Sequence, residues 1–218
     1  MKRIFDGATS LDLLEGEGWA WVGLDSTDGL HRLHSETLLA LDRLFTELRF
    51  KGARRVALGA SGWMTGQGRH FSAGADLHEV AALRPETADA FARRGQRVMR
   101  ALQWPGWRTL TLMSGVAMGG GCDLALHGQE RWAVANLKMA HPAAKHGILT
   151  GFGGTVRLPG LLGAANAARL FAALEHWNAE DARAAGAVQR ILESGEVREA
   201  VLQWLKAPAV NPTSSSPA

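Results

Sequence analysis

Two glycine-rich segments of the chain combine small residues with the start of a predicted helix. The first is Phe-Ser-Ala-Gly-Ala-Asp-Leu at 71–77, and the second is Gly-Val-Ala-Met-Gly-Gly-Gly-Cys-Asp-Leu-Ala at 115–125. The first N–H groups of a helix have no acceptor within the helix and lie at the positive end of its dipole. Small residues let a ligand oxygen approach this backbone closely. Together the segments predict two backbone N–H donors that bind and polarise a carbonyl oxygen.

Glycine-rich segments also form structural turns, phosphate loops and dinucleotide sites. A turn is the commoner interpretation of either segment alone, whereas the pair, each after a predicted strand, favours a shared donor site. No Gly-Lys-Ser/Thr sequence follows the glycines, which argues against a phosphate loop. The spacing from Gly115 to Gly119 also lacks the Gly-x-Gly-x-x-Gly pattern of a dinucleotide site.

Predicted strands and helices alternate along the chain, which indicates an α/β fold. Short apolar runs predict strands at residues 11–14, 19–24, 55–58, 109–113, 131–135 and 188–192. Helical periodicity predicts helices at residues 34–50, 76–104 with a break near 84–85, 122–126, 155–162, 164–174, 178–185 and 197–205. Residues 59–74, 117–121 and 147–154 are predicted loops. Each glycine-rich segment therefore leads from a loop into a helix.

The length and composition are typical of one globular domain. The 218 residues include 46% hydrophobic and 21% charged residues. We expect a core over residues 1–192, a short C-terminal helix within 193–206 and a disordered Pro/Ser-rich tail over 207–218. The net charge is only +3 and no run of Lys or Arg exceeds two residues, so nucleic acid is not an expected partner.

The cysteine content and the hydropathy pattern bear on location. Cys122 is the only cysteine, so an intrachain disulfide is excluded, which fits a reducing compartment. No stretch of 18 apolar residues occurs, so no membrane span is expected. We therefore predict a cytoplasmic protein, and we expect no bound metal.

The chain resembles the crotonase (enoyl-CoA hydratase/isomerase) family. The resemblance rests on the two glycine-rich segments and on Gly-Ile-Leu-Thr-Gly-Phe-Gly-Gly-Thr-Val-Arg-Leu at 147–158 and Asn-Ala-Glu-Asp-Ala-Arg-Ala-Ala-Gly-Ala-Val at 178–188. It extends over residues 11–195. The resemblance implies a crotonase-like spiral of ββα units, here with a shortened C-terminal helical region. It also implies a homo-oligomer, a trimer or a hexamer.

The resemblance further implies an acyl-CoA or acyl-carrier thioester as partner, with coenzyme A as part of the substrate and no separate cofactor. Ala75 and Gly120 match the two family residues whose backbone N–H groups bind the thioester oxygen. The neighbouring positions are expected to bind substrate, namely Arg69, Ala73, Gly74, Asp76, Gly119, Gly121 and Pro142.

The resemblance is incomplete at the two positions that carry the family's proton-transfer residues. The two glutamates of the family's hydratases fall on Asp123 and Ala143, and an alanine cannot transfer a proton. Asp123 is therefore the first candidate for proton transfer and His141 the second, with Lys145 and His146 nearby. An acid in the first turn of a helix is also a common structural choice, so a purely structural role for Asp123 stays open.

These observations predict an acyl-CoA enzyme of the hydratase/isomerase type, a lyase or an isomerase, that stabilises a thioester enolate. Decarboxylation and double-bond isomerisation are alternatives, because decarboxylation depends on the oxyanion site more than on two carboxylates. An alternative of a different class is a non-catalytic protein that binds acyl thioesters, and Ala143 is the residue that favours it.

Overall fold

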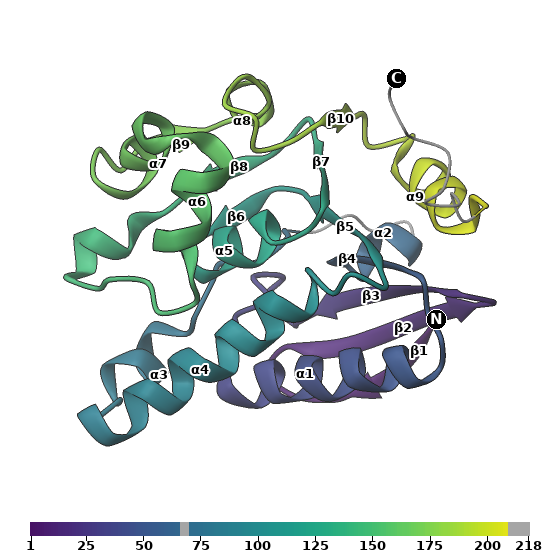
Figure 1. The fold of residues 1–218 in the computed structure, drawn as a ribbon, viewed down its shortest axis with the longest axis horizontal. Helices are drawn as coiled ribbons and strands as arrows, with labels where there is room; N and C mark the ends of the chain where they lie inside the picture. Colours follow the sequence, from purple (N-terminus) through teal and green to yellow (C-terminus); the bar gives the residue numbers. More distant parts are fainter. Residues whose placement is uncertain (66–69, 209–218) are drawn as a thin grey trace, which may run out of the picture.

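The computed structural model describes residues 1–65 and 70–208, and it confirms the predicted α/β fold (Figure 1). Within these ranges the larger sheet has seven strands, in the order β1 (Lys2–Phe5), β2 (Ser10–Gly16), β3 (Trp19–Asp25), β4 (Arg55–Ala60), β5 (Arg108–Met113), β7 (Glu130–Val134) and β10 (Arg190–Leu192). Strands β2 and β3, both predicted, form an antiparallel hairpin, and β3 to β10 run parallel. Parallel neighbours need crossover connections, and helices supply most of them.

The described helices include those that were predicted, with shifts at their ends, and two short helices that were not predicted. The helices are α1 (Ser35–Phe50), α2 (Gly62–Thr65), α3 (Leu77–Ala81), α4 (Pro85–Ala101), α5 (Gly120–Leu126), α6 (Gly154–Leu162), α7 (Ala164–Phe171), α8 (Ala179–Ala184), α9 (Val197–Lys206) and the 3₁₀ helix η1 (Pro142–His146). The predicted break falls at Pro85, which begins α4. Gly52 adopts a φ of 75° just after α1, the left-handed conformation expected of a residue that ends a helix.

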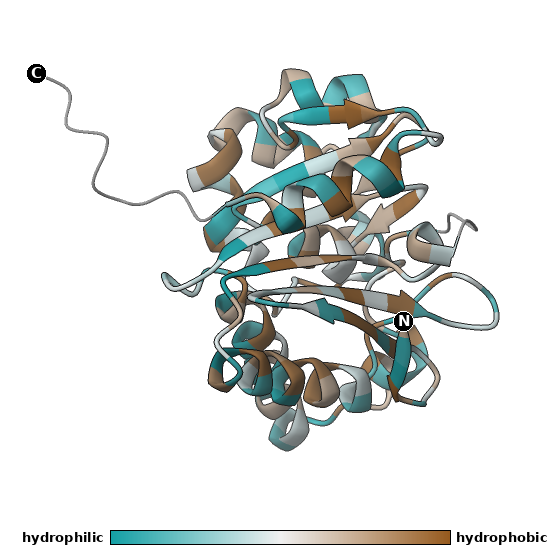
Figure 2. Cartoon of the chain, turned by 90° about the vertical axis from the view of Figure 1, so that its right-hand side faces the viewer, coloured by the Kyte–Doolittle hydropathy of each residue, from teal (hydrophilic) through white to brown (hydrophobic). Residues whose placement is uncertain are grey.

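Each face of the larger sheet is covered by different helices (Figures 1 and 2). Successive side chains of a strand point to opposite faces, so Val56 and Leu58 of β4 join the core beneath α1 and α4, whereas Ala57 joins the core beneath α2 and α9. Trp21 and Leu58 are fully buried. Burying one such side chain stabilises the fold by about 1.5–3 kcal/mol. Burial on both faces makes the sheet a rigid platform for the loops at its edge.

A second sheet corrects the prediction of a loop at residues 117–121. Here β6 (Val116–Met118) pairs in parallel with β8 (Lys138–Ala140), and β8 pairs antiparallel with β9 (His176–Trp177). Strands of two or three residues are too short to show an alternating pattern in the sequence. The four-residue strand β1 of the larger sheet was also not predicted. The α2 helix likewise lies inside the predicted loop at 59–74. The second sheet fixes the backbone that enters α5.

The C-terminal helix was predicted, but the tail after it begins in an ordered conformation. The Arg55 guanidinium is almost fully buried and donates to the carbonyl oxygens of Ala207, at 3.1 Å, and Pro208, at 2.9 Å. These two hydrogen bonds hold Ala207 and Pro208, the first two residues of the segment that the sequence analysis predicted to be disordered. The remainder, 209–218, lies outside the described residues. In the described part of the chain, no helix is long and apolar enough to cross a membrane.

Candidate active site

Residues 71–75 form a loop that is fixed on two sides by hydrogen bonds. On one side, the Ser72 N–H donates to Val116 at 3.0 Å, and the Ser72 carbonyl accepts from Met118 at 2.9 Å. On the other side, the Ala73 N–H donates to the Leu30 carbonyl at 2.7 Å. The buried Ser72 hydroxyl also donates to the His31 carbonyl at 2.7 Å. The loop is therefore built into the second sheet before it reaches Ala75.

Glycines let this loop pack directly on the start of α5. Gly74 has a φ of +90°, and a Cβ there would lie 2.5 Å from the Met118 carbonyl oxygen and 2.9 Å from the Gly120 nitrogen. A Cβ on Gly121 would lie 2.4 Å from the Ser72 carbonyl oxygen. Gly119, the N-cap of α5, has φ 53° and ψ −123°, a conformation that excludes ordinary side chains. The residue types of both segments thus follow from backbone contact.

The structure brings the two predicted donors, Ala75 and Gly120, side by side. A Cβ on Gly120 would lie 3.4 Å from the Ala75 nitrogen. Gly120 is the first residue of α5, so its N–H has no acceptor within the helix. Ala75 lies two residues before α3 and not in its first turn, because Asp76 is the N-cap and accepts from the Glu79 N–H at 2.9 Å. Both donor residues line one cavity.

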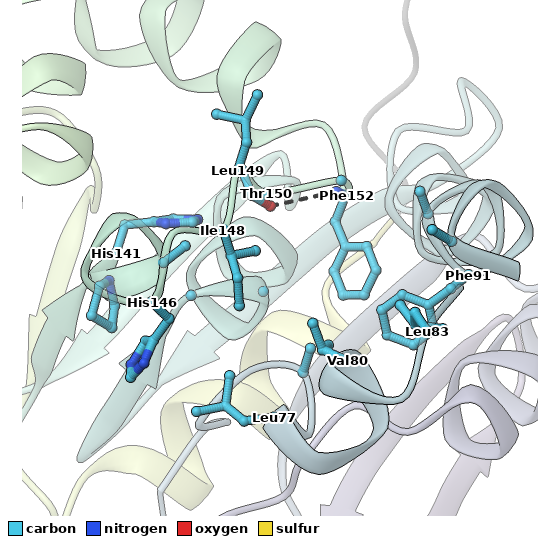
Figure 3. A pocket seen from close by; sticks show the side chains of 18 of the residues that line it. Leu77, Val80, Leu83, Phe91, His141, His146, Ile148, Leu149, Thr150 and Phe152 are labelled. Atoms are coloured by element: carbon cyan, nitrogen blue, oxygen red, sulfur yellow. Dashed lines mark hydrogen bonds between the residues drawn. The ribbon is translucent and has the colours of Figure 1, made fainter. Parts of the chain in front are cut away.

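This cavity encloses about 500 Å³ and is mostly apolar (Figure 3). Its larger apolar side chains come from α3, α4, the turn between these helices and the loop before α6, namely Leu77, Val80, Leu83, Phe91, Ile148, Leu149 and Phe152. The rings of Phe91 and Phe152 are in contact, with their centroids 5.3 Å apart. Gly95 makes room for this contact, since a Cβ there would lie 2.2 Å from the Phe152 ring. The cavity suits an apolar chain whose polar end reaches the paired N–H groups.

Only three residues with polar side chains line the cavity in the described part of the chain. They are His141, His146 and Thr150. No carboxylate is among these described lining residues, and Ala143 of η1 occupies a place on the wall. The described lining of the cavity therefore places no carboxylate beside Ala75 and Gly120.

The Asp123 carboxylate lies behind the wall and is fully buried. Its Oδ1 lies 3.2 Å from Nε2 of His141, and its Oδ2 accepts a hydrogen bond from the Thr150 hydroxyl. A Cβ on Gly154 would lie 1.8 Å from Oδ1, so a glycine is required there. The neighbouring His127 donates from Nδ1 to the Asp123 carbonyl at 2.7 Å, and burial lowers the pKa of His127. Asp123 is thus the centre of a buried polar cluster.

The His141 ring completes this cluster. Its side chain is fully buried and packs on Phe171, with the ring centroids 4.5 Å apart. Because the Asp123 carboxylate accepts, Nε2 carries the hydrogen in the Asp123–His141 pair. Among the described residues, Nδ1 has no hydrogen-bond partner.

A model of the enoyl-CoA hydratase/isomerase family matches residues 62–216. The chain belongs to this family. One relative in the hydratase/isomerase family is the short-chain-enoyl-CoA hydratase of Clostridium acetobutylicum, which is 30% identical over 187 residues, or 85% of this chain and 70% of the relative. The crotonyl-CoA hydratase of Syntrophomonas wolfei is 32% identical over 182 residues, or 83% of this chain and 68% of the relative.

Solved structures confirm the crotonase-like fold. Pseudomonas aeruginosa DspI superposes with a TM-score of 0.82 at 30% identity, over 93% of this chain and 75% of that chain. An enoyl-CoA hydratase from Thermoplasma volcanium gives a TM-score of 0.81 at 25% identity, over 91% and 78% of the two chains. The family assignment therefore agrees with both the sequence motifs and the architecture.

The remaining predicted site residues of this family member differ in where they lie. Ala73, Gly119 and Pro142 line the cavity, as a substrate-binding role requires. Gly74 and Gly121 instead form the contact between the two segments. Asp76 caps α3 and lies 3.8 Å from the Arg32 guanidinium, and it is not among the described lining residues. Arg69 lies outside the described residues.

Thr150 was missed by the sequence analysis. Its hydroxyl connects the cavity wall to Asp123, a residue 27 positions earlier in the chain. The only available signal was a hydroxyl-bearing residue within a glycine-rich turn. That signal does not reveal which distant group the hydroxyl meets.

Among the described residues, no group of three or more His, Cys, Asp and Glu is arranged to hold a metal ion.

Proposed function

We propose that this member of the hydratase/isomerase family is an acyl-CoA enzyme that forms a thioester enolate. The observation that carries the proposal is the adjacency of the Ala75 and Gly120 nitrogens at the wall of an apolar cavity. Two fixed N–H donors stabilise an oxyanion more than a neutral carbonyl, and this difference lowers the barrier to reaction. Removing one donor of such a pair typically costs about 10²–10³ in kcat.

The cavity favours an apolar acyl group. With the thioester oxygen at the donor pair, the acyl chain extends between α3 and the loop that carries Ile148 and Phe152. Burial of apolar surface then contributes about 25 cal/mol per Å² to binding, before the cost of ordering the ligand. Coenzyme A and an acyl carrier protein present the same thioester group. We choose coenzyme A first because the two relatives are named as hydratases of enoyl-CoA and crotonyl-CoA.

Asp123, which is paired with His141, is the group that transfers a proton in this proposal. The two side chains lie 3.2 Å apart, and the position of the second family carboxylate is Ala143. Hydration is the first candidate reaction, given the similarity to two hydratases. Double-bond isomerisation and decarboxylation pass through the same enolate and are the alternatives. A cytoplasmic location and a homo-oligomeric state remain predictions from the sequence.

The test is turnover of a panel of thioesters by the purified protein. The panel contains trans-2-enoyl-CoAs of increasing length, a 3-enoyl-CoA and a malonyl-type CoA. We expect at least one to be consumed, with preference for an apolar acyl group. Loss of the conjugated enoyl thioester absorbance reports hydration, its appearance reports isomerisation, and release of CO₂ reports decarboxylation. The absence of turnover for every member contradicts an enzymatic role.

A second candidate function is binding of acyl thioesters without catalysis. It is favoured by one observation, the lack of a carboxylate among the described residues that line the cavity. Titration calorimetry with a saturated acyl-CoA separates the two functions. Binding without turnover of any panel member supports the binding protein, and the absence of binding contradicts both proposals.

A further inference from the structure

Asp123 has the chemistry for proton transfer but no direct access to the cavity. Its side chain is fully buried and is not among the described lining residues. The groups that cover its two oxygens are His141 and Thr150. Both His141 and Thr150 line the cavity, but the His141 side chain is fully buried whereas Thr150 is only partly buried. Of the two groups that bond Asp123, Thr150 is therefore the more accessible to a ligand.

The Thr150 hydroxyl has a defined orientation. It donates to Oδ2 of Asp123 and accepts from the Phe152 N–H at 3.4 Å (Figure 3). A hydroxyl has one hydrogen to donate and two lone pairs, so one lone pair remains for a ligand. The loop itself is tied to α4, because the Gln96 side chain donates to the Gly151 carbonyl at 2.8 Å. The loop thus holds the hydroxyl at the cavity wall.

We propose that Thr150 is a catalytic residue that passes a proton between the substrate and Asp123. This inference rests on the proposed function. When an α-proton is removed, the Cα–H bond of the acyl group breaks and its proton forms a bond to the Thr150 oxygen; in hydration the same transfer runs in reverse and protonates the α-carbon. The original Thr150 hydrogen passes to Oδ2 of Asp123. The electron pair left on the α-carbon moves to the thioester oxygen, where the Ala75 and Gly120 N–H groups stabilise the enolate.

His141 acts in this step as a positioning residue. Its Nε2–H bonds Oδ1 of Asp123, so Oδ2 is the oxygen that faces Thr150. The ring is held in turn by Phe171. A relay through the Thr150 hydroxyl explains how a proton can move in a site where position 143 is an alanine and Asp123 is fully buried.

The experiment compares variants of Thr150 in a reaction that reports proton transfer alone. Butyryl-CoA is incubated with the full chain in D₂O, and loss of its α-protons is followed by NMR. Thr150→Val keeps the shape but removes the hydroxyl, whereas Thr150→Ser keeps the hydroxyl. We expect Thr150→Val to lose at least about 100-fold in exchange rate, the size of a general acid–base contribution. We expect Thr150→Ser to stay within about 10-fold of wild type.

Two measurements make the result specific to catalysis. Binding of butyryl-CoA, measured by calorimetry, is expected to change less than about 3-fold in Thr150→Val. Thr155→Val is the matched control, because Thr155 is exposed on α6, in the same segment, and does not line the cavity. This control is expected to exchange at the wild-type rate. Thr150→Ala is the second variant if Thr150→Val does not fold.

Several results overturn the relay. Exchange by Thr150→Val at the wild-type rate shows that the hydroxyl is not needed. A parallel loss of binding and exchange shows that Thr150 only shapes the cavity. If wild type binds butyryl-CoA but exchanges no α-proton, the relay is wrong while thioester binding stands. If wild type does not bind the thioester, the proposed function itself fails.

Discussion

At Asp123, both carboxylate oxygens are occupied by side chains of the protein. His141 bonds one oxygen and Thr150 the other, and the whole group is removed from solvent. Burying a carboxylate without partners is costly, whereas hydrogen bonds to its charged form offset much of that cost. The same hydrogen bonds place His141 and Thr150 over the two oxygens, and both of these residues line the cavity whereas Asp123 is not among its described lining residues.

Asp123→Asn is expected to lower kcat by about 10²–10⁴, because the amide cannot take up a proton as the carboxylate does. The amide has nearly the same shape, so binding of a saturated acyl-CoA is expected to change little. Turnover of the best panel substrate and calorimetry measure the two quantities. Turnover at the wild-type rate would show that Asp123 is structural.

Gly154→Ala is expected to destabilise the fold and disturb the Asp123 cluster. The added Cβ would lie 1.8 Å from Oδ1 of Asp123, and steric overlap of this kind typically costs about 1–3 kcal/mol. Chemical denaturation measures the loss. Gly160→Ala is the control, because Gly160 lies on the same helix with nothing within 4 Å of an added Cβ. There a gain of about 1 kcal/mol is expected from helix propensity; equal effects of the two substitutions would contradict the clash.

At the scale of elements, α3 follows the loop at residues 71–75 and contributes to the cavity wall. The helix is only five residues long and none of its residues is fully buried, so its cap contributes much of its order. Asp76 supplies that cap, and the hydrogen bond from the Glu79 N–H is the main cause that lowers the pKa of Asp76. Leu77 and Val80 of this helix line the cavity. Loss of the cap should therefore affect substrate binding more than chemistry.

Asp76→Ala is expected to cost about 0.5–2 kcal/mol of stability and to raise KM more than it lowers kcat. The cap acts through the charged form of Asp76, so its contribution to the free energy of unfolding is fully present when the pH is above the ordinary aspartate pKa. It is lost as pH falls through the lowered pKa of the folded state. Asn178→Ala removes the corresponding cap of α8, whose residues do not line the cavity. A similar rise in KM in both variants would contradict the proposed role of α3.

At the scale of the whole molecule, burial on both faces of the sheet encloses titratable groups as well as apolar ones. His31 and His127 are nearly inaccessible to solvent, and burial is the main cause that lowers the pKa of each. The charged groups that act on His127 are Asp123, which raises its pKa, and Arg157, which lowers it. The folded state therefore takes up fewer protons at these sites than the unfolded chain.

The free energy of unfolding is expected to fall as pH decreases below about 6.5, the ordinary histidine pKa. The unfolded chain binds protons there while His31 and His127 stay neutral until pH reaches their lowered folded-state pKa, so the sign is destabilisation by acid. Urea denaturation at several pH values measures the slope. His127→Asn keeps a donor for the Asp123 carbonyl but cannot titrate, and it should flatten the slope. An unchanged slope would exclude a contribution from His127.

Much of the fold was predictable because long elements carry their own pattern. The hairpin of β2 and β3, helix α1 and the break before α4 follow from local periodicity, glycine and proline. Strands β8 and β9 were not predictable, since two or three residues carry no period and such strands form only when distant segments meet. Strand β6, which pairs with β8, leads directly into α5.

The sequence by itself predicted the family, the α/β architecture and the two glycine-rich segments, because close backbone contacts at Gly74 and Gly121 require small residues, and such residues leave a local signature. It also singled out Asp123 and Ala143. Only the tertiary structure decided that Asp123 lies behind the cavity wall and that Thr150 covers it. Burial and long-range hydrogen bonds are properties of the packed chain, and no local pattern encodes which side chains they bring together.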